Sequence, residues 1–118
     1  MQLAWGSNSS IQMIDEVAKN MHGHRAMIMN AGRAAEMGIE EGDLVEIKST
    51  LRATKGRVAL KQGIRPDTIL IQGQFDHWVT PYSKDNPAPS MNTVVPMSLA
   101  LTDATGSSAD IVRVAVTK

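Results

Sequence analysis

Several short runs of the chain alternate apolar and polar residues in the way that half-buried β-strands do. In residues 44–48, LVEIK, Val45 and Ile47 face one side, while Glu46 and Lys48 face the other. Related runs predict further strands over these ranges: residues 3–5, 26–29, 56–61, 68–71 and 111–116. Many short strands separated by turn residues indicate a closed β-barrel, in which sheet edges disappear.

The stretch NAGRAAEMGI predicts a short helix that ends in a tight corner. Asn30 can accept a hydrogen bond from a free N–H in the first turn of a helix over residues 31–37. Gly38 supplies the left-handed conformation that ends such a helix, and Ile39 can fold back as the accompanying apolar contact. Residues 41–43 then form a turn before the next strand.

A second helix is predicted near the N-terminus. Ser9 and Gln12 fit a capping box, and apolar residues follow at helical spacing to about Asn20. Residues 22–24 are predicted to be a loop, and so is the longer segment 73–92, which is rich in Pro, Asn, Asp and Ser. A loop of that length in a compact domain is usually functional or disordered, and its Phe, His and Trp argue against plain disorder.

Two corners of the chain are similar in sequence. Residues 38–44, GIEEGDL, and residues 63–69, GIRPDTI, both begin with Gly-Ile and reach an Asp before a strand. The similarity hints at two related halves, although turn chemistry alone could produce it.

Composition narrows the functional classes. The chain has 118 residues, 42% of them hydrophobic, which suits one soluble domain. Its 12 basic and 12 acidic residues give net charge 0, so there is no basic excess to hold a nucleic-acid backbone. No apolar run reaches membrane-spanning length, and we expect neither a membrane contact nor a signal peptide. The absence of cysteine excludes disulfides, thiolate zinc sites and cysteine-ligated clusters within the chain.

From Asn30 to Ile71 the order of motifs resembles the C-terminal domain of the molybdopterin oxidoreductases, the dimethyl sulfoxide reductase family. The residues that match the family pattern are Ala34, Ala35, Gly38, Ile39, Gly42, Asp43, Gly63, Ile64 and Pro66. Ala31 and Asp67 depart from it, since the family has proline and glycine there. The tail from Ser90 to Lys118 is also similar to the end of the family's domain, so the resemblance covers nearly the whole chain.

The resemblance implies a mainly β fold with short helices, a double-psi β-barrel of the aspartate-decarboxylase-like type. It implies one domain over residues 1–118, which binds molybdopterin guanine dinucleotide as the C-terminal fragment of a larger molybdenum or tungsten oxidoreductase. The metal ligand and iron–sulfur clusters of that family belong to other domains, so we expect no catalytic or metal-ligating residue in this chain and no activity from it alone.

Cofactor-binding positions follow from the same resemblance. The first loop, whose glycine permits close backbone approach and whose hydroxyls and amides can bond to a phosphate, contributes Gly6, Ser7, Asn8, Ser9, Ser10, Gln12 and Met13. Many relatives carry Arg and His in this loop, and this chain has neither. The remaining predicted positions are Gln74, His77, Trp78, Asn92, Ser107 and Ser108. Each of these has a plainer interpretation as a turn or a self-packed loop residue.

Other interpretations stay open. His22, His24 and His77 could form a metal set, although no carboxylate pattern accompanies them. A self-cleaving pyruvoyl decarboxylase needs a Gly-Ser bond, which Gly6-Ser7 and Gly106-Ser107 both offer. A free-standing barrel could also act as a small subunit or a partner-binding module.

The resemblance names partners as well. It implies contact with the other domains of the same catalytic subunit and with an iron–sulfur electron-transfer subunit. It points to a bacterial or archaeal enzyme and leaves the compartment open between cytoplasm and periplasm.

Overall fold

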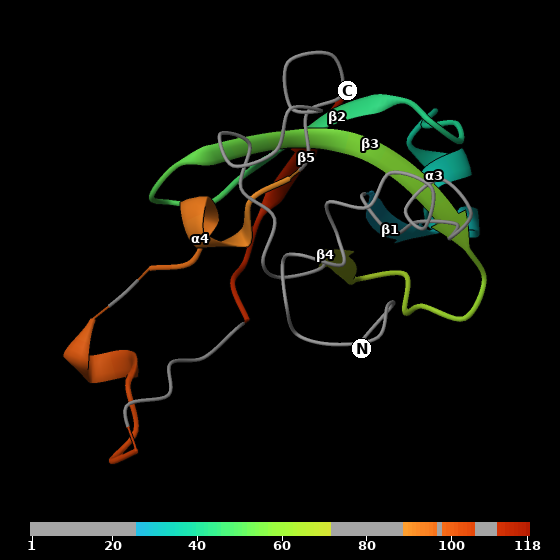
Figure 1. Cartoon of the computed structure of the whole chain (residues 1–118). Coiled ribbons are helices and arrows are strands. Elements are labelled where there is room, and N and C mark those ends of the chain that lie inside the picture. The colour runs from blue at the N-terminus through green and yellow to red at the C-terminus, as the bar shows by residue number, and fades with distance from the viewer. Residues whose placement is uncertain (1–25, 72–88, 97, 106–110) are drawn as a thin grey trace, which may run out of the picture.

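The computed structural model describes residues 26–71, 89–96, 98–105 and 111–118 (Figure 1). Its elements are, in chain order, β1 (Met27–Asn30), α3 (Ala31–Glu36), β2 (Leu44–Lys48), β3 (Ala53–Lys61), β4 (Ile69–Ile71), α4 (Met91–Val94), the 3-10 helix η2 (Leu99–Leu101) and β5 (Ala115–Thr117). The described part of the chain is therefore mainly β, with a few short helices, as the sequence predicts.

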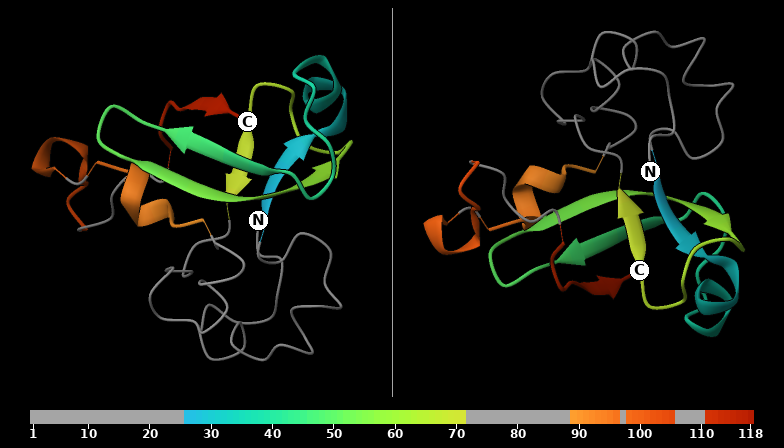
Figure 2. Two further views of the ribbon diagram at one scale, coloured as in Figure 1. Left: turned by 90° about the horizontal axis from the view of Figure 1, so that it is seen from above. Right: turned by 90° about the horizontal axis from the view of Figure 1, so that it is seen from below.

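The strands form one five-stranded sheet in the order β4-β1-β3-β2-β5. β2 and β3 form an antiparallel hairpin, β5 lies antiparallel to β2, and β4 lies antiparallel to β1. β1 runs parallel to β3, with Met27 opposite Val58 and Asn30 opposite Lys61. Figures 1 and 2 show the long strand β3 arching over the others, so that the sheet curls into half a barrel.

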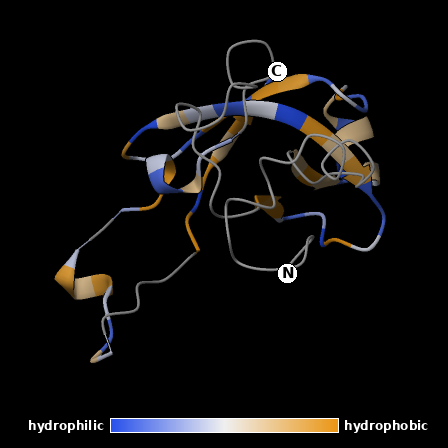
Figure 3. Ribbon diagram, viewed as in Figure 1, coloured by the Kyte–Doolittle hydropathy of each residue, from blue (hydrophilic) through white to orange (hydrophobic). Residues whose placement is uncertain are grey.

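The core lies on the concave face of this sheet. Its side chains come from the inward positions of the strands, from α3 and from α4, and they include Met27, Ile39, Val45, Val58 and Val94. Figure 3 shows hydrophilic and hydrophobic residues along β3, and its exposed and buried positions alternate from Ala53 to Val58. Methionine fills part of the core, in accord with the small number of aromatic residues in the chain.

The corner after α3 forms as the sequence predicts. The side chain of Asn30 accepts a hydrogen bond from the Arg33 N–H at 3.0 Å, and Gly38 has φ 67°. The N–H groups of Gly38 and Ile39 donate to the carbonyls of Ala35 and Ala34, which is the Schellman pairing. Ile39 is buried against the core.

The second corner does not repeat the first. Gly38 and Gly42 have positive φ, whereas Gly63 does not. Around Gly63 the turn is held by other bonds, among them Asp67 accepting from Arg65 at 2.7 and 3.0 Å. The two corners, although similar in sequence, therefore form two different turns.

The bounds of β1 and β4 differ from the prediction by one residue, and those of β3 and β5 differ by more. β3 begins at Ala53 rather than at Gly56, because the hairpin continues to the turn at Ser49–Arg52 and Gly56 lies in mid-strand. β5 is confined to Ala115–Thr117, although the sequence predicts a strand over 111–116. Ala115 faces Lys48, the last residue of β2, so the chain before Ala115 has no further strand to pair with there. The predicted strand 3–5, the helix from Ser9 to Asn20 and the loop 22–24 lie outside the described residues.

Candidate functional site

Asn92 is the one predicted cofactor-binding residue that falls within the described ranges. It lies on α4 with its side chain exposed. Among the residues that the structure describes, none forms a hydrogen bond with the Asn92 amide. An amide that offers both a donor and an acceptor to solvent fits the polar edge of a pterin or a purine.

The other predicted positions are not described, and they remain predictions. They are Gly6, Ser7, Asn8, Ser9, Ser10, Gln12, Met13, Gln74, His77, Trp78, Ser107 and Ser108. His22 and His24 lie outside the described ranges too, as do both Gly-Ser bonds.

α4 packs against the inner face of the sheet through the side of the helix that is opposite Asn92. Val94 is 1% exposed and Val95 8% exposed, and both belong to the core cluster. Asn92 lies two residues from Val94, about 200° around a helix, so one side of the helix faces the core while the other faces solvent. Figure 1 shows α4 beneath one half of β3.

The residues just before α4 dock on β3. Pro89 and Ser90 are fully buried, and the Ser90 N–H donates to the Thr54 hydroxyl at 3.0 Å. Pro89 packs where a side chain at Gly56 would stand. Sequence patterns do not reveal this role of Thr54 and Gly56, since the contact joins segments more than thirty residues apart and neither segment carries a local signal for it.

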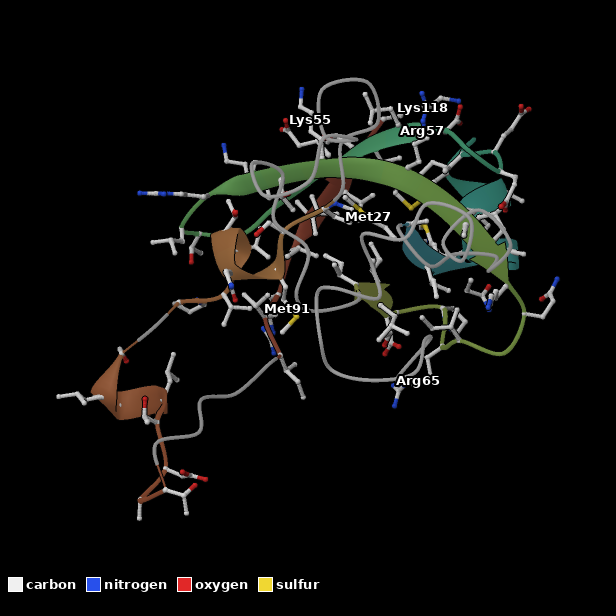
Figure 4. The ribbon with its side chains drawn as sticks, in the orientation of Figure 1. Met27, Lys55, Arg57, Arg65, Met91 and Lys118 are labelled. Carbon is white, nitrogen blue, oxygen red and sulfur yellow. The ribbon has the colours of Figure 1, made fainter. Side chains whose placement is uncertain are left out.

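The described residues next to two undescribed segments, 1–25 and 72–88, lie close together. Met27 lies two residues after the first undescribed segment, and Ile71 directly precedes the next one. The two residues face each other across β1 and β4. Pro89, the first described residue after that second segment, approaches the same point of Gly56 as the Met27 side chain does. The sheet thus brings the borders of the segments 1–25 and 72–88 to the concave side near Met27, beneath β3 in Figure 4.

The region that borders Ser107 and Ser108 lies elsewhere. Residues 98–105 form an arm that extends away from the sheet in every view (Figures 1 and 2). Its 3-10 helix η2 presents Leu99, which is 94% exposed, and Ile111 after the next undescribed stretch is 90% exposed. The structure therefore does not bring the described part of this arm to Asn92.

A shallow depression of about 420 Å³ lies at the opposite end of β3. It is lined by Ala31, Ala35, Gly38, Ile39, Glu40, Glu41 and Leu60. Leu60 is six residues along β3 from Thr54, roughly 20 Å at the rise of a strand. The lining contains two carboxylates and no cationic side chain, so it does not suit a phosphate or another anion.

Charged groups gather on the outer face and at the corners. Figure 4 places Lys55, Arg57 and Lys118 on the convex side of the sheet. Lys55 pairs with Glu46 at 3.4 Å, and Lys118 pairs with Asp43 at 2.6 Å. Hydrogen bonds from the Glu40 N–H and from Lys118 lower the pKa of Asp43, and those from Arg65 and Thr68 lower the pKa of Asp67. These pairs lie on the corners and strands of the sheet and on its outer face.

Metal ligation and membrane spanning have no candidate in the described part of the chain. It contains no group of three or more His, Cys, Asp or Glu side chains that could hold a metal ion. No helix found there is both long enough and apolar enough to cross a membrane.

Comparison with protein families identifies the family of the chain. A family model described as "Molydopterin dinucleotide binding domain" matches residues 2–110, which is most of the chain. The chain belongs to this molybdopterin dinucleotide binding domain family. A search of the curated proteins finds no match to the chain.

Proposed function

We propose that this chain binds molybdopterin guanine dinucleotide as the C-terminal domain of a molybdenum or tungsten oxidoreductase catalytic subunit, on a double-psi β-barrel. The observation that carries the proposal is the family match over residues 2–110, since the family binds molybdopterin dinucleotide. The curled five-stranded sheet is consistent with a barrel. The exposed Asn92 amide supplies one group of the right chemistry.

In this proposal the protein orients the cofactor, and the chemistry is the cofactor's. When bound, the dinucleotide supplies the sulfur ligands that hold the metal. Asn92 donates to and accepts from a pterin or guanine edge. Gly6, Ser7, Asn8, Ser9, Ser10, Gln12 and Met13 serve the phosphates, and Gln74, His77, Trp78, Ser107 and Ser108 line the remainder of the site.

The proposed partners are the other domains of the same catalytic subunit and an iron–sulfur electron-transfer subunit. The chain has no cysteine, so thiolate ligands for such clusters must come from elsewhere. Because other domains complete the pocket, the isolated chain should bind guanine nucleotides weakly. Submicromolar binding of GDP by calorimetry would contradict this fragment picture.

The test of the site uses two probes, GDP and 6-hydroxymethylpterin, titrated into the full 118-residue chain and followed by NMR. Asn92→Ala should weaken one of them roughly three- to tenfold, the effect of one net hydrogen bond. Gln62→Ala removes an exposed amide from the other end of β3 and serves as the matched control. Unchanged affinity of Asn92→Ala for both probes would remove Asn92 from the site.

One observation favours a second candidate, a small subunit or partner-binding module. Leu99 and Ile111 expose nearly their whole side chains, and Figure 3 shows η2 as apolar. If these side chains belong to one contiguous apolar patch, that patch would suit a contact with another protein. A blot of the source cells separates the two candidates. A band several times larger than this chain supports the oxidoreductase subunit, and a band at the mass of the chain supports the small subunit.

A further inference from the structure

β3 makes a close contact with the residue that leads into α4. A Cβ atom at Gly56 would lie 2.8 Å from Pro89 Cδ and 3.0 Å from Pro89 Cγ. It would also lie 3.0 Å from the Cε atom of Met27. Real side chains do not approach this closely, so any other residue at position 56 displaces Pro89 or Met27. Gly56 does not have positive φ, and the glycine is therefore required by the contact and not by the backbone conformation.

A buried hydrogen bond holds the next residue, Ser90, in place. The Ser90 N–H donates to Thr54 Oγ1 at 3.0 Å, with Ser90 1% and Thr54 9% exposed. A buried N–H that loses its acceptor is costly, so this bond selects one position for the chain at Ser90. Thr54 and Gly56 are successive inward positions of β3, separated by the exposed Lys55. Two neighbouring positions of one strand thus hold two consecutive residues, Pro89 and Ser90.

The contacts of Pro89 and Ser90 with β3 determine the position of Asn92. Ser90 is the N-cap of α4, and Asn92 is the second residue of the helix. The far end of the helix is held in the core by Val94 and Val95. With both ends fixed, the direction of the Cα–Cβ bond of Asn92 is set, and the residue is exposed to solvent.

We propose that Thr54 and Gly56 are positioning residues for the Asn92 amide in cofactor binding. Neither touches the ligand, and both act by setting the position of α4 through Pro89 and Ser90. This inference rests on the proposed function, in which Asn92 contacts the dinucleotide. It adds that residues of β3, which no cofactor motif marks, set the affinity of that contact.

The experiment titrates GDP and 6-hydroxymethylpterin into variants of the full chain by NMR. Gly56→Ala and Thr54→Val should weaken the probe that Asn92→Ala weakens, by roughly three- to tenfold, as expected when one hydrogen bond is misaligned. Thr54→Ser keeps the hydroxyl and should restore the affinity. Gly63→Ala is the control for Gly56→Ala, because a Cβ atom at Gly63 meets nothing within 4 Å.

A double-mutant cycle separates positioning from general stability. In the Asn92→Ala background, Gly56→Ala and Thr54→Val should cause no further loss of affinity, because their effect passes through that amide. An undiminished further loss in that background would overturn the positioning role. Wild-type affinity of both single variants, with Asn92→Ala still weakened, would overturn it too and leave the proposed function intact. Wild-type affinity of Asn92→Ala would instead overturn the proposed contact on which the inference rests.

Two further measurements keep the proposal testable if Gly56→Ala folds poorly. Pro89→Ala removes the Cγ and Cδ atoms that the new Cβ would meet, so the Gly56→Ala/Pro89→Ala pair should bind more tightly than Gly56→Ala alone. Hydrogen exchange at the Ser90 amide should be faster in Thr54→Val than in Thr54→Ser. Equal exchange in these two variants would show that Thr54 does not hold Ser90.

Discussion

Asn30 shows how one buried amide can serve two turns. Its Oδ1 atom caps α3 by accepting from Arg33, and its Nδ2 atom donates to the Ile64 carbonyl at 2.8 Å. The residue is 8% exposed, so both ends of the amide need partners. The sequence predicts the first bond from the motif after β1, whereas the second depends on how β4 returns to β1.

Gly38 gives a prediction at the same scale. Gly38→Ala should lower the free energy of unfolding by about 1 kcal/mol, because alanine is strained in the left-handed conformation. A Cβ atom there would meet nothing within 4 Å, so the cost comes from the backbone alone. Urea unfolding followed by circular dichroism measures it. Gly63→Ala is the matched control and should change stability by only a few tenths of a kcal/mol, about the effect of a surface substitution. Equal losses in the two variants would contradict the interpretation.

At the scale of elements, the corner of residues 38–43 is bonded to two distant parts of the fold, β3 and the end of β5. Gly42 N–H donates to the Val58 carbonyl and Val58 N–H donates to the Asp43 carbonyl, each at 2.9 Å. At the end of β5, Lys118 donates to Asp43 at 2.6 Å and to the Gly38 carbonyl at 3.0 Å. A turn that is encoded locally in the sequence thus becomes an attachment point for β3 and β5.

The Asp43–Lys118 pair predicts a pH dependence of stability. The pKa of Asp43 is lower in the folded chain, so its contribution is present above the unfolded pKa and is lost as pH falls through the folded value. The pKa of Lys118 is higher in the folded chain, mainly through its bond to Asp43. Its contribution is present below the unfolded pKa and lost as pH rises through the folded value.

Asp43→Asn should therefore flatten the fall in stability between about pH 4 and pH 2, the range below an ordinary Asp pKa. Lys118→Met should flatten the same limb only in part, because the hydrogen bond from the Glu40 N–H still lowers the pKa of Asp43. It should also flatten the fall on the alkaline side. Urea unfolding at a series of pH values measures both limbs. If the free energies of unfolding of Asp43→Asn and wild type fall in parallel in acid, Asp43 does not cause the acid limb.

At the scale of the whole molecule, the described chain is a curled sheet with its core on the concave side. The same side receives Pro89, Ser90 and α4, and Met27 and Ile71, which lie next to the undescribed segments 1–25 and 72–88, are paired there. The outer face carries charged side chains such as Lys55 and Lys118. The architecture thus separates a solvated face from a concave face on which the Asn92 helix is mounted.

In the proposed function this chain binds the cofactor, while other domains supply the metal ligand and the iron–sulfur clusters. We therefore predict that the pure chain is redox-inactive. A chain without cysteine cannot hold a thiolate-ligated electron-transfer cluster, and in the proposed enzyme the metal ligand comes from another domain. Incubation with candidate substrates and a redox dye should therefore give no substrate-dependent reduction, while a complete molybdenum oxidoreductase in the same assay reduces the dye. Reduction by the pure chain would mean that it is a complete enzyme in its own right.

The sequence by itself determined the features that depend on near neighbours. The Asn30 cap, the left-handed Gly38, the turn at Gly42 and the alternation of Val45 and Ile47 all follow from residues a few positions apart. Local patterns therefore suffice to predict them. The resemblance also named the family, which the family model confirms. For the candidate site it named thirteen positions, and Asn92 is the one that the structure describes. Asn92 is exposed and lies on α4.

Only the tertiary structure decided which distant segments meet. The strand order β4-β1-β3-β2-β5 and the short extent of β5 depend on where partner strands end. The bonds from Ser90 to Thr54 and from Asn30 to Ile64 join residues 36 and 34 apart. Local patterns carry no information on such pairs, because a buried donor can be satisfied by any acceptor that the fold brings within reach. Gly56 is the clearest case: the sequence predicts a strand that starts at this glycine, and only the packing of Pro89 shows why no side chain fits there.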